Sequence, residues 1–256
     1  MPITRQHTLS FSCIGQRAVN QDALYPAPGQ AVAQDRLFMV CDGMGGADKG
    51  EVASKLLCEA IMTYYRIRDA PTLDASHLQL AINQTHCNYR TYLAQHPLVN
   101  RMGSTLALLQ LNGNTALVAH IGDSRVYHVR DGVVLFQTHD HKQVNDLVAA
   151  GIISAEQALT HPWRNRLSRA VVEKNGADKS PDSQPDVQLI ADLRVGDYFF
   201  LCTDGILEQV DNYTLAEILT GDLPDQTKLQ TLLTLCEGRT KDNYSGHLVH
   251  IQPVDE

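Results

Sequence analysis

Short apolar runs recur along the chain, and several of them end at an aspartate. Runs of this length, rich in β-branched and aromatic residues, are typical of buried strands, so each acid lies where a strand leaves the core. The runs are 37–41, which leads into Asp42; 116–121, which leads into Asp123; and 198–202, which leads into Asp204. A further acid, Asp242, stands close to the C-terminus. The pattern predicts that acids far apart in sequence gather at strand ends.

Carboxylates at such positions need a partner, because burying a charge is costly unless something offsets it. Little positive charge lies near these acids in the sequence. Bound cations are the most economical partner, and a cluster of oxygen ligands suits Mg²⁺ or Mn²⁺. A single Asp-Gly pair is commonly no more than a turn, but four such acids beside the glycine-rich stretch 43–46 favour a metal site.

Apolar residues at helical spacing predict two long helices in the first half of the chain. One covers 50–66 and the other covers 74–95, where Asp74 or Ser76 serves as N-cap and Pro97 follows the end. Shorter helical segments are expected within 142–151 and from Ser154, and two more helices are expected at 212–220 and 225–237.

Two-residue turns predict β-hairpins between the helical regions. Asn112-Gly113 and Asp131-Gly132 separate three runs, which predicts an antiparallel meander. The runs cover 105–111, 115–121 continuing through 126–129, and 133–138. The stretch 173–186 is interpreted as an exposed loop, and further strands are expected at 187–190, 197–202 and 246–252. With no repeat and no linker, we expect a single α+β domain over 1–256.

Composition narrows the class of protein. The chain has 256 residues, 43% apolar residues and a net charge of −8, which indicates an ordinary globular protein and argues against a nucleic-acid partner. Its six cysteines include no Cys-x-x-Cys pair, so reduced thiols and a cytoplasmic location are expected. No apolar signal segment opens the chain and no run is long enough to span a membrane, so no membrane partner is expected.

Taken as a set, the motifs resemble those of the metal-dependent type-2C (PPM-type) Ser/Thr protein phosphatases in their compact bacterial form. The resemblance covers nearly the whole chain. It rests on Arg17 with Asn20-Gln21-Asp22, the stretch 42–46, Gly103-Ser104-Thr105, Gly122-Asp123-Ser124-Arg125, Thr203-Asp204-Gly205 and Asp242-Asn243.

The resemblance implies a fold and a metal site. Two antiparallel sheets would pack as a sandwich flanked by pairs of helices, a four-layer α/β/β/α arrangement with a binuclear metal site at one edge. By match, Asp42 bridges two Mn²⁺ or Mg²⁺ ions and the Gly43 carbonyl completes one shell. Asp204 and Asp242 are further ligands, and Asp22 acts through a metal-bound water. Two close cations need a bridging carboxylate and terminal carboxylates from separate elements.

Other matches concern the substrate and a third metal. Arg17 matches the phosphate-binding arginine, whose planar guanidinium can hold two phosphate oxygens. Asp123 matches an acid that helps to hold a third, weaker metal, although a turn in which Asp123 pairs with Arg125 is an alternative. Residues 142–186 correspond to a flap subregion, where Arg164 and Arg166 either contact substrate or belong to a solvated loop.

The sequence departs from the family's pattern at two places, and it also contains a cluster of histidines. Met44 stands where animal members commonly carry a histidine, so the leaving group must take its proton from water or another side chain. Tyr244-Ser245-Gly246-His247 follows Asp242-Asn243 in place of a β-branched run, which predicts a late start for the last strand. His139 and His141 flank Asp140; a metal site is conceivable there, but an ordering role beside the active site is favoured.

The predicted function is therefore hydrolysis of phosphoserine and phosphothreonine in proteins by a water activated between two cations, without a phosphoenzyme. Phosphorylated substrates of a Ser/Thr kinase would be its partners, and a monomer is expected. The alternatives are a non-catalytic binding module of the same fold, which loss of the metal acids would mark, and a metal-dependent nuclease, which the acidic charge opposes.

Overall fold

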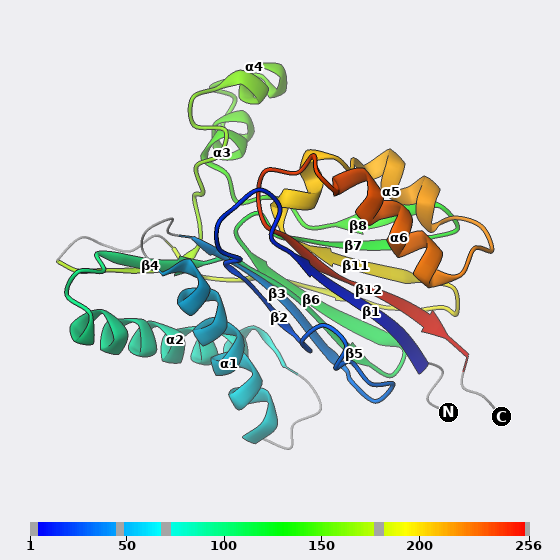
Figure 1. The fold of residues 1–256 in the computed structure, drawn as a ribbon, viewed down its shortest axis with the longest axis horizontal. Helices are drawn as coiled ribbons and strands as arrows, with labels where there is room; N and C mark the ends of the chain where they lie inside the picture. Colours follow the sequence, from blue (N-terminus) through cyan, green and yellow to red (C-terminus); the bar gives the residue numbers. More distant parts are fainter. Residues whose placement is uncertain (1–4, 45–48, 68–72, 177–181, 254–256) are drawn as a thin grey trace.

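The computed structural model describes residues 5–44, 49–67, 73–176 and 182–253. It contains two antiparallel sheets that pack face to face (Figure 1). The first has the strand order β1-β12-β11-β7-β8. Its strands are β1 (Arg5–Cys13), β12 (Tyr244–Gln252), β11 (Tyr198–Cys202), β7 (Arg125–Arg130) and β8 (Val133–Gln137).

The second sheet has the order β10-β6-β5-β3-β4-β9, and β2 also pairs with β3. Its strands are β10 (Asp186–Ile190), β6 (Thr115–Ile121), β5 (Leu106–Asn112), β3 (Leu37–Met44), β4 (Arg101–Ser104), β9 (Val171–Lys174) and β2 (Asp22–Tyr25). Between the sheets lies a buried apolar layer that includes Phe38, Leu109 and Phe199. Side chains alternate across each strand, so the opposite faces are left for the helices.

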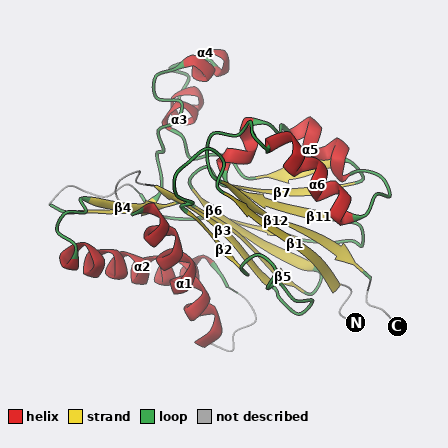
Figure 2. Ribbon diagram, in the orientation of Figure 1, coloured by secondary structure: helices red, strands yellow, loops and turns green. Residues whose placement is uncertain are grey.

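Helix pairs cover the two outer faces (Figure 2). The helices α1 (Gly50–Ile67) and α2 (Ala75–Gln95) pack on the second sheet around a buried cluster that includes Leu57 and Tyr89. The helices α5 (Asn212–Leu219) and α6 (Asp225–Cys236) pack on the first sheet, where Leu232 of α6 lies in the same buried cluster as Phe200 of β11. The predicted four-layer α/β/β/α sandwich is therefore confirmed. Two short helices, α3 (Gln143–Ala149) and α4 (Ala155–Thr160), project from one end of the sandwich.

The predicted meander is wrong in one respect, because the run 115–129 does not stay in one sheet. It divides into β6 of the second sheet and β7 of the first, and the chain crosses between them at 122–124. Gly122 makes the crossing possible. Its φ is +100°, and a Cβ at this position would lie 2.6 Å from Cγ2 of Thr105. Only glycine adopts such a backbone conformation without strain.

Two further element boundaries differ from the prediction. The last strand begins at Tyr244 and not at 246, because Tyr244 and Ser245 pair with Cys13 and Ser12 of β1. The expected loop 173–186 begins within a strand, since β9 extends to Lys174 and pairs with β4, another strand that the apolar pattern did not reveal. Part of that expected loop, 177–181, lies outside the described residues.

Candidate active site

The strands and turns that carry the predicted acids meet at one edge of the sandwich. Asp22 and Asp42 are register partners on β2 and β3. Asp204 opens a short 3₁₀ helix, η1 (Asp204–Glu208), directly after β11, and Asp242 stands two residues before β12. Asp123 lies on the crossing between the two sheets. Each acid therefore stands at or near the end of a strand, as the sequence pattern indicates.

The carboxylates lie close enough together to raise one another's pKa values. Desolvation raises the pKa of Asp42 well above its usual value, and the charges of Asp22, Asp204, Asp123 and Asp242 raise it further, in that order. Desolvation is also the main reason why the pKa values of Asp22 and Asp204 rise to about 7. Carboxylates shifted in this way are poised to accept a cation, which would relieve both the repulsion and the lost hydration.

One carboxylate oxygen in this cluster lacks a partner. Oδ2 of Asp22 accepts a hydrogen bond from the Thr203 hydroxyl at 3.0 Å, whereas Oδ1 is buried without any hydrogen bond. A buried acceptor of this kind is costly unless water or a cation binds it. Together with the carbonyl of Gly43, the five carboxylates form an all-oxygen donor set, which fits Mg²⁺ or Mn²⁺.

Gly43 is required by the close packing around it. Its N–H donates to the carbonyl of Gln21 at 3.1 Å, and a Cβ at this position would collide with the carbonyl of Gly50 at the start of α1. The backbone of β3 is therefore clamped between two other segments directly after Asp42. Any larger residue would move the backbone that positions this aspartate.

Arg17 lies at the same cluster. Its Nη2 donates to Oδ2 of Asp242 at 2.6 Å, and this bond, followed by the charges of Asp242, Asp42 and Asp204, raises the pKa of the guanidinium. Oδ1 of Asp242 accepts the N–H of Asn243 at 2.8 Å. Both oxygens of Asp242 thus have protein partners, which makes it the least available of the predicted ligands.

Two supporting residues belong to the matched motifs, although the sequence alone predicts no role for them. Asn243 accepts the N–H of Gln21 at 2.9 Å and donates to the carbonyls of Ile14 and Val19 at 2.8 and 3.1 Å. It therefore ties the loop that carries Arg17 to the start of β12. Thr105 holds Asp42, whose N–H donates to its hydroxyl at 3.0 Å. The sequence signal for both is membership of the matched motifs: Asn243 follows Asp242, and Thr105 ends Gly103-Ser104-Thr105.

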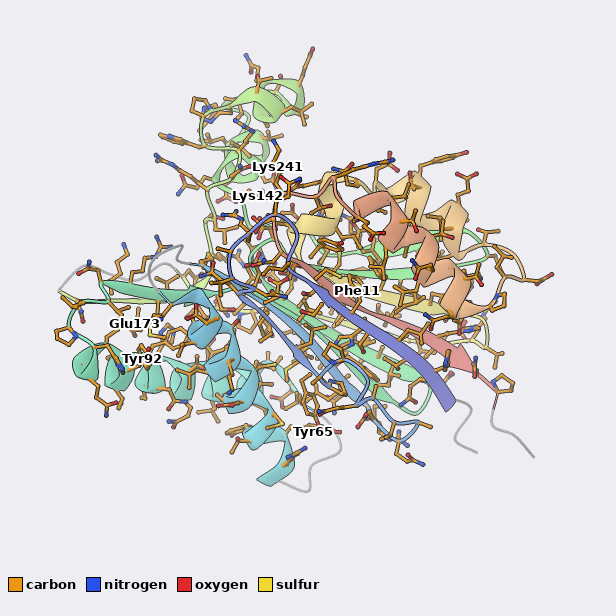
Figure 3. The ribbon with its side chains drawn as sticks, in the orientation of Figure 1. Phe11, Tyr65, Tyr92, Lys142, Glu173 and Lys241 are labelled. Carbon is orange, nitrogen blue, oxygen red and sulfur yellow. The ribbon has the colours of Figure 1, made fainter. Side chains whose placement is uncertain are left out.

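A lysine that the sequence did not single out contacts Asp123. Nζ of Lys142 lies 3.2 Å from Oδ2 of Asp123 and 3.1 Å from Oδ2 of Asp140. Figure 3 shows Lys142 at the base of the segment that carries α3 and α4. Desolvation raises the pKa of Asp123, and Lys142 opposes that rise. The alternative pairing of Asp123 with Arg125 is wrong, because Arg125 makes a bidentate pair with Asp140 at 2.6 and 2.9 Å.

The histidines form a hydrogen-bonded network. His120 and His141 stack at 4.4 Å, and their ligand atoms lie within 4.8 Å of a carboxylate oxygen of Asp186. Nδ1 of His141 accepts the N–H of Gly122, so its Nε2 carries the hydrogen that faces Asp186 at 3.1 Å. Nε2 of His120 lies 2.8 Å from the carbonyl of His139. These bonds support the ordering role over a metal site.

The two flap arginines have different neighbours. Arg164 and Arg166 are both exposed on the segment that follows α4, and the Arg166 guanidinium lies 5.3 Å from the ring centre of Trp163. Arg166 also borders a cavity that Met44 shares, whereas Arg164 is absent from the walls of that cavity.

Comparison with known proteins agrees with this geometry. The family model described as protein phosphatase 2C matches residues 11–228. The chain belongs to this family. It is 30% identical over 226 residues to protein phosphatase PhpP of Streptococcus pneumoniae, which covers 86% of this chain and 87% of the relative.

Solved structures extend the comparison to three dimensions. The serine/threonine phosphatase PstP/Ppp of Mycobacterium tuberculosis superposes with a TM-score of 0.76 and 30% identity, covering 98% of this chain and 99% of that one. A PstP catalytic domain in complex with two manganese ions matches with a TM-score of 0.74 and 29% identity over the same shares. The protein is thus a metal-dependent Ser/Thr protein phosphatase. No helix among the described residues is long and apolar enough to cross a membrane.

Proposed function

We propose that the acid cluster holds two divalent cations, with Asp42 between them, Asp204 and Asp242 as further ligands, the Gly43 carbonyl in one shell and Asp22 acting through water. The orphaned Oδ1 of Asp22, in a cluster where desolvation and repulsion raise carboxylate pKa values, is the observation that carries this assignment. The two manganese ions of the PstP relative support the same number. Mn²⁺ and Mg²⁺ both suit the donor set.

Arg17 positions the phosphoryl group in this proposal. Its guanidinium is more than half exposed and reaches the rim of the cluster, where Asp242 holds it. When bound, the cations supply an activated water nucleophile and neutralise charge on the phosphoryl oxygens. Arg17 would donate to phosphoryl oxygens from the rim of the cluster. Met44 has no proton to give, so the leaving alcohol takes its proton from water or from another side chain.

Lys142 affects the predicted third metal. Its ammonium lies 3.2 Å from the carboxylate of Asp123 and therefore already supplies a positive charge at that acid. A third cation at Asp123 would have to displace this ammonium or lie close to a like charge. We therefore expect two cations to bind tightly, and any third to bind much more weakly.

Several broader expectations belong to this proposal. The chain acts as one catalytic domain with a flap over 142–186, and it works as a monomer in the cytoplasm. Its protein substrates are phosphorylated by a Ser/Thr kinase. Size-exclusion chromatography with light scattering tests the monomer, and fractionation of the cells that make it tests the location.

Phosphate release from a phosphothreonine peptide tests the core of the proposal. Activity should require Mn²⁺ or Mg²⁺, disappear with a chelator and return when metal is restored. Metal content measured by elemental analysis should approach two ions per chain. Asp204→Asn should lose activity and one ion. Full activity in chelator, or cleavage of no phosphopeptide with any metal, would reject the assignment.

A further inference from the structure

A cavity of about 520 Å³ lies beside the acid cluster. Its walls come from the end of β3, from the β4–β9 pair and from the base of the α3–α4 segment; they include Met44, Arg101, Arg166 and Lys174. Asp42 precedes Met44 by two residues, which is about 7 Å along a strand. A peptide bound at the acid cluster would therefore have this cavity as its neighbour.

The cavity carries a concentrated positive charge. Arg101, Arg166 and Lys174 are the charged residues among its walls, and no acid lines it within the described part of the chain. In that same part, none of the three side chains forms an ion pair, and the Arg166 guanidinium lies over the ring of Trp163. Three uncompensated cations around one cavity are notable in a chain whose net charge is −8. Their chemistry fits an anion.

The arrangement of β4 and β9 supports the same conclusion independently. Arg101 and Lys174 are direct cross-strand partners, and like charges in such positions destabilise a sheet. The adjacent acid, Glu173, faces the other way and accepts from Arg90 of α2 at 2.7 Å. In Figure 3, Glu173 lies next to α2, close to Tyr92 of that helix. Strand alternation thus turns the neighbouring acid of β9 away from the cavity and leaves the two cations together.

We infer that this cavity binds an anionic side chain of the phosphoprotein substrate, either a carboxylate or a second phosphate. The inference rests on the proposed function, because the acid cluster must hold the phosphate that is hydrolysed. An extended peptide advances about 3.3–3.6 Å per residue, so the anionic side chain lies within about three residues of the phosphorylated one. Arg101, Lys174 and Arg166 then determine which phosphosites the enzyme prefers.

A phosphothreonine peptide panel tests this subsite. Flanking alanines at three positions on either side are replaced singly by Glu, phosphoserine, Gln or Lys, and kcat/KM is measured with Mn²⁺, using mass spectrometry to identify the phosphate released. At one or two positions, Glu or phosphoserine should raise kcat/KM about tenfold over Gln, as expected for hydrogen bonds to charged groups. If only phosphoserine raises kcat/KM, the cavity binds a second phosphate. If Glu raises it as well, the cavity also binds carboxylates.

Two variants make the result specific. Arg101→Gln with Lys174→Gln should reduce the preference to less than about twofold, while turnover of the Gln peptide and of a small aryl phosphate stays unchanged. The double variant should melt at or above the wild-type temperature, since it removes a like-charge pair. Arg36→Gln with Lys55→Gln is the matched control: it removes two exposed cations away from the cavity and should keep the preference.

The possible outcomes distinguish failure of the proposed function from failure of the subsite inference. Failure to hydrolyse the aryl phosphate with Mn²⁺ would reject the proposed function and not the subsite. Binding of the same peptides to Asp204→Asn, measured by fluorescence anisotropy, then tests the subsite alone. A wild-type enzyme without any preference for anionic flanks, or a preference that persists in the Arg101→Gln/Lys174→Gln variant, would overturn the inference.

Discussion

Two aspartates flank β11, and their surroundings are opposite. Asp204 follows the strand at the acid cluster, where desolvation and then the charges of Asp123 and Asp242 raise its pKa to about 7. Asp197 precedes the strand at the other end and is fully buried. Burial alone would raise the pKa of Asp197. Bidentate hydrogen bonds from Arg130 at 2.6 and 2.8 Å, together with His128 and the N–H of Arg194, outweigh burial and lower it.

The difference indicates why Asp204, and not Asp197, suits the proposed metal site. Asp197 has a guanidinium, the N–H of Arg194 at 2.9 Å and Nε2 of His128 at 3.0 Å around its carboxylate. Asp204 has mainly other acids around it, and Lys142 is the cation that opposes its raised pKa. The position relative to the strand is similar, so the neighbours decide the role. The protein supplies positive charge to Asp197, whereas in our proposal a bound cation supplies it to Asp204.

The largest expected effect is on activity. Asp204→Asn should lower kcat/KM about 10³-fold, equivalent to about 4 kcal/mol, because a metal site contributes several kcal/mol of charge stabilisation. The melting temperature without metal should stay the same or rise, since the variant removes one repelling carboxylate. Steady-state kinetics and thermal melts check both effects. Activity within tenfold of wild type would contradict the assignment.

The matched change at the other end of β11 should affect stability instead. Asp197→Asn leaves Arg130 without its counter-ion, which typically costs about 3–5 kcal/mol for a buried pair. The melting temperature should fall by on the order of 10 °C. Activity at 20 °C should be retained, because Asp197 is remote from the acid cluster. A variant that melts normally but is inactive would break the comparison.

The two acids also predict opposite pH dependence. A raised pKa means that the folded state holds its proton more tightly than the unfolded chain, so Asp204 and Asp22 destabilise the metal-free protein as pH rises from about 4 to above 7. Bound cations should offset this destabilisation, because they neutralise the ionised carboxylates. Mn²⁺ should therefore raise the melting temperature more at pH 8 than at pH 5.5, as calorimetry with and without chelator can measure.

The lowered pKa of Asp197 acts in the other direction. Its contribution is complete above the unfolded pKa of about 4 and is lost as pH falls through the lower folded value. The melting temperature of the wild type should therefore fall as the pH is lowered below about 4. In Asp197→Asn, the melting temperature should fall less steeply over the same pH range. An equally steep fall would argue that Arg130 does not determine the charge state of Asp197.

The smallest expected effect concerns Lys142. If a cationic neighbour keeps Asp123 from acting as a ligand, Lys142→Met should make Asp123 resemble Asp204. Titration calorimetry with Mn²⁺ should then detect an additional site, or a gain of a few-fold in affinity at the weakest site. Arg125→Met is the control, because Arg125 pairs with Asp140 and not with Asp123. Unchanged binding in the Lys142 variant would show that Asp123 is not a latent ligand.

The sequence predicts the acids and the layers well, because both leave local signals. Apolar runs ending at Asp42 and Asp204 mark strand ends, and helical spacing marks α1 and α2. What it misses depends on contacts between distant residues. Nothing local separates Asp197 from Asp204, since Arg130 lies 67 positions away from Asp197. The change of sheet at Gly122 looks like an ordinary turn, and Lys142 resembles any surface lysine until the fold places it on Asp123.

The pairing of β1 with β12 has a consequence for how the enzyme is made. Cys13 lies opposite Tyr244, and Asp242 stands just before that pair. Because the ribosome adds about 5–20 residues per second, it synthesises β1 at least about ten seconds before β12, the strand that pairs with it. During that interval the nascent polypeptide exposes an unpaired edge, a liability that chaperones manage. Under the proposed assignment it also lacks the ligand Asp242, so dephosphorylation would begin only after translation has passed this residue.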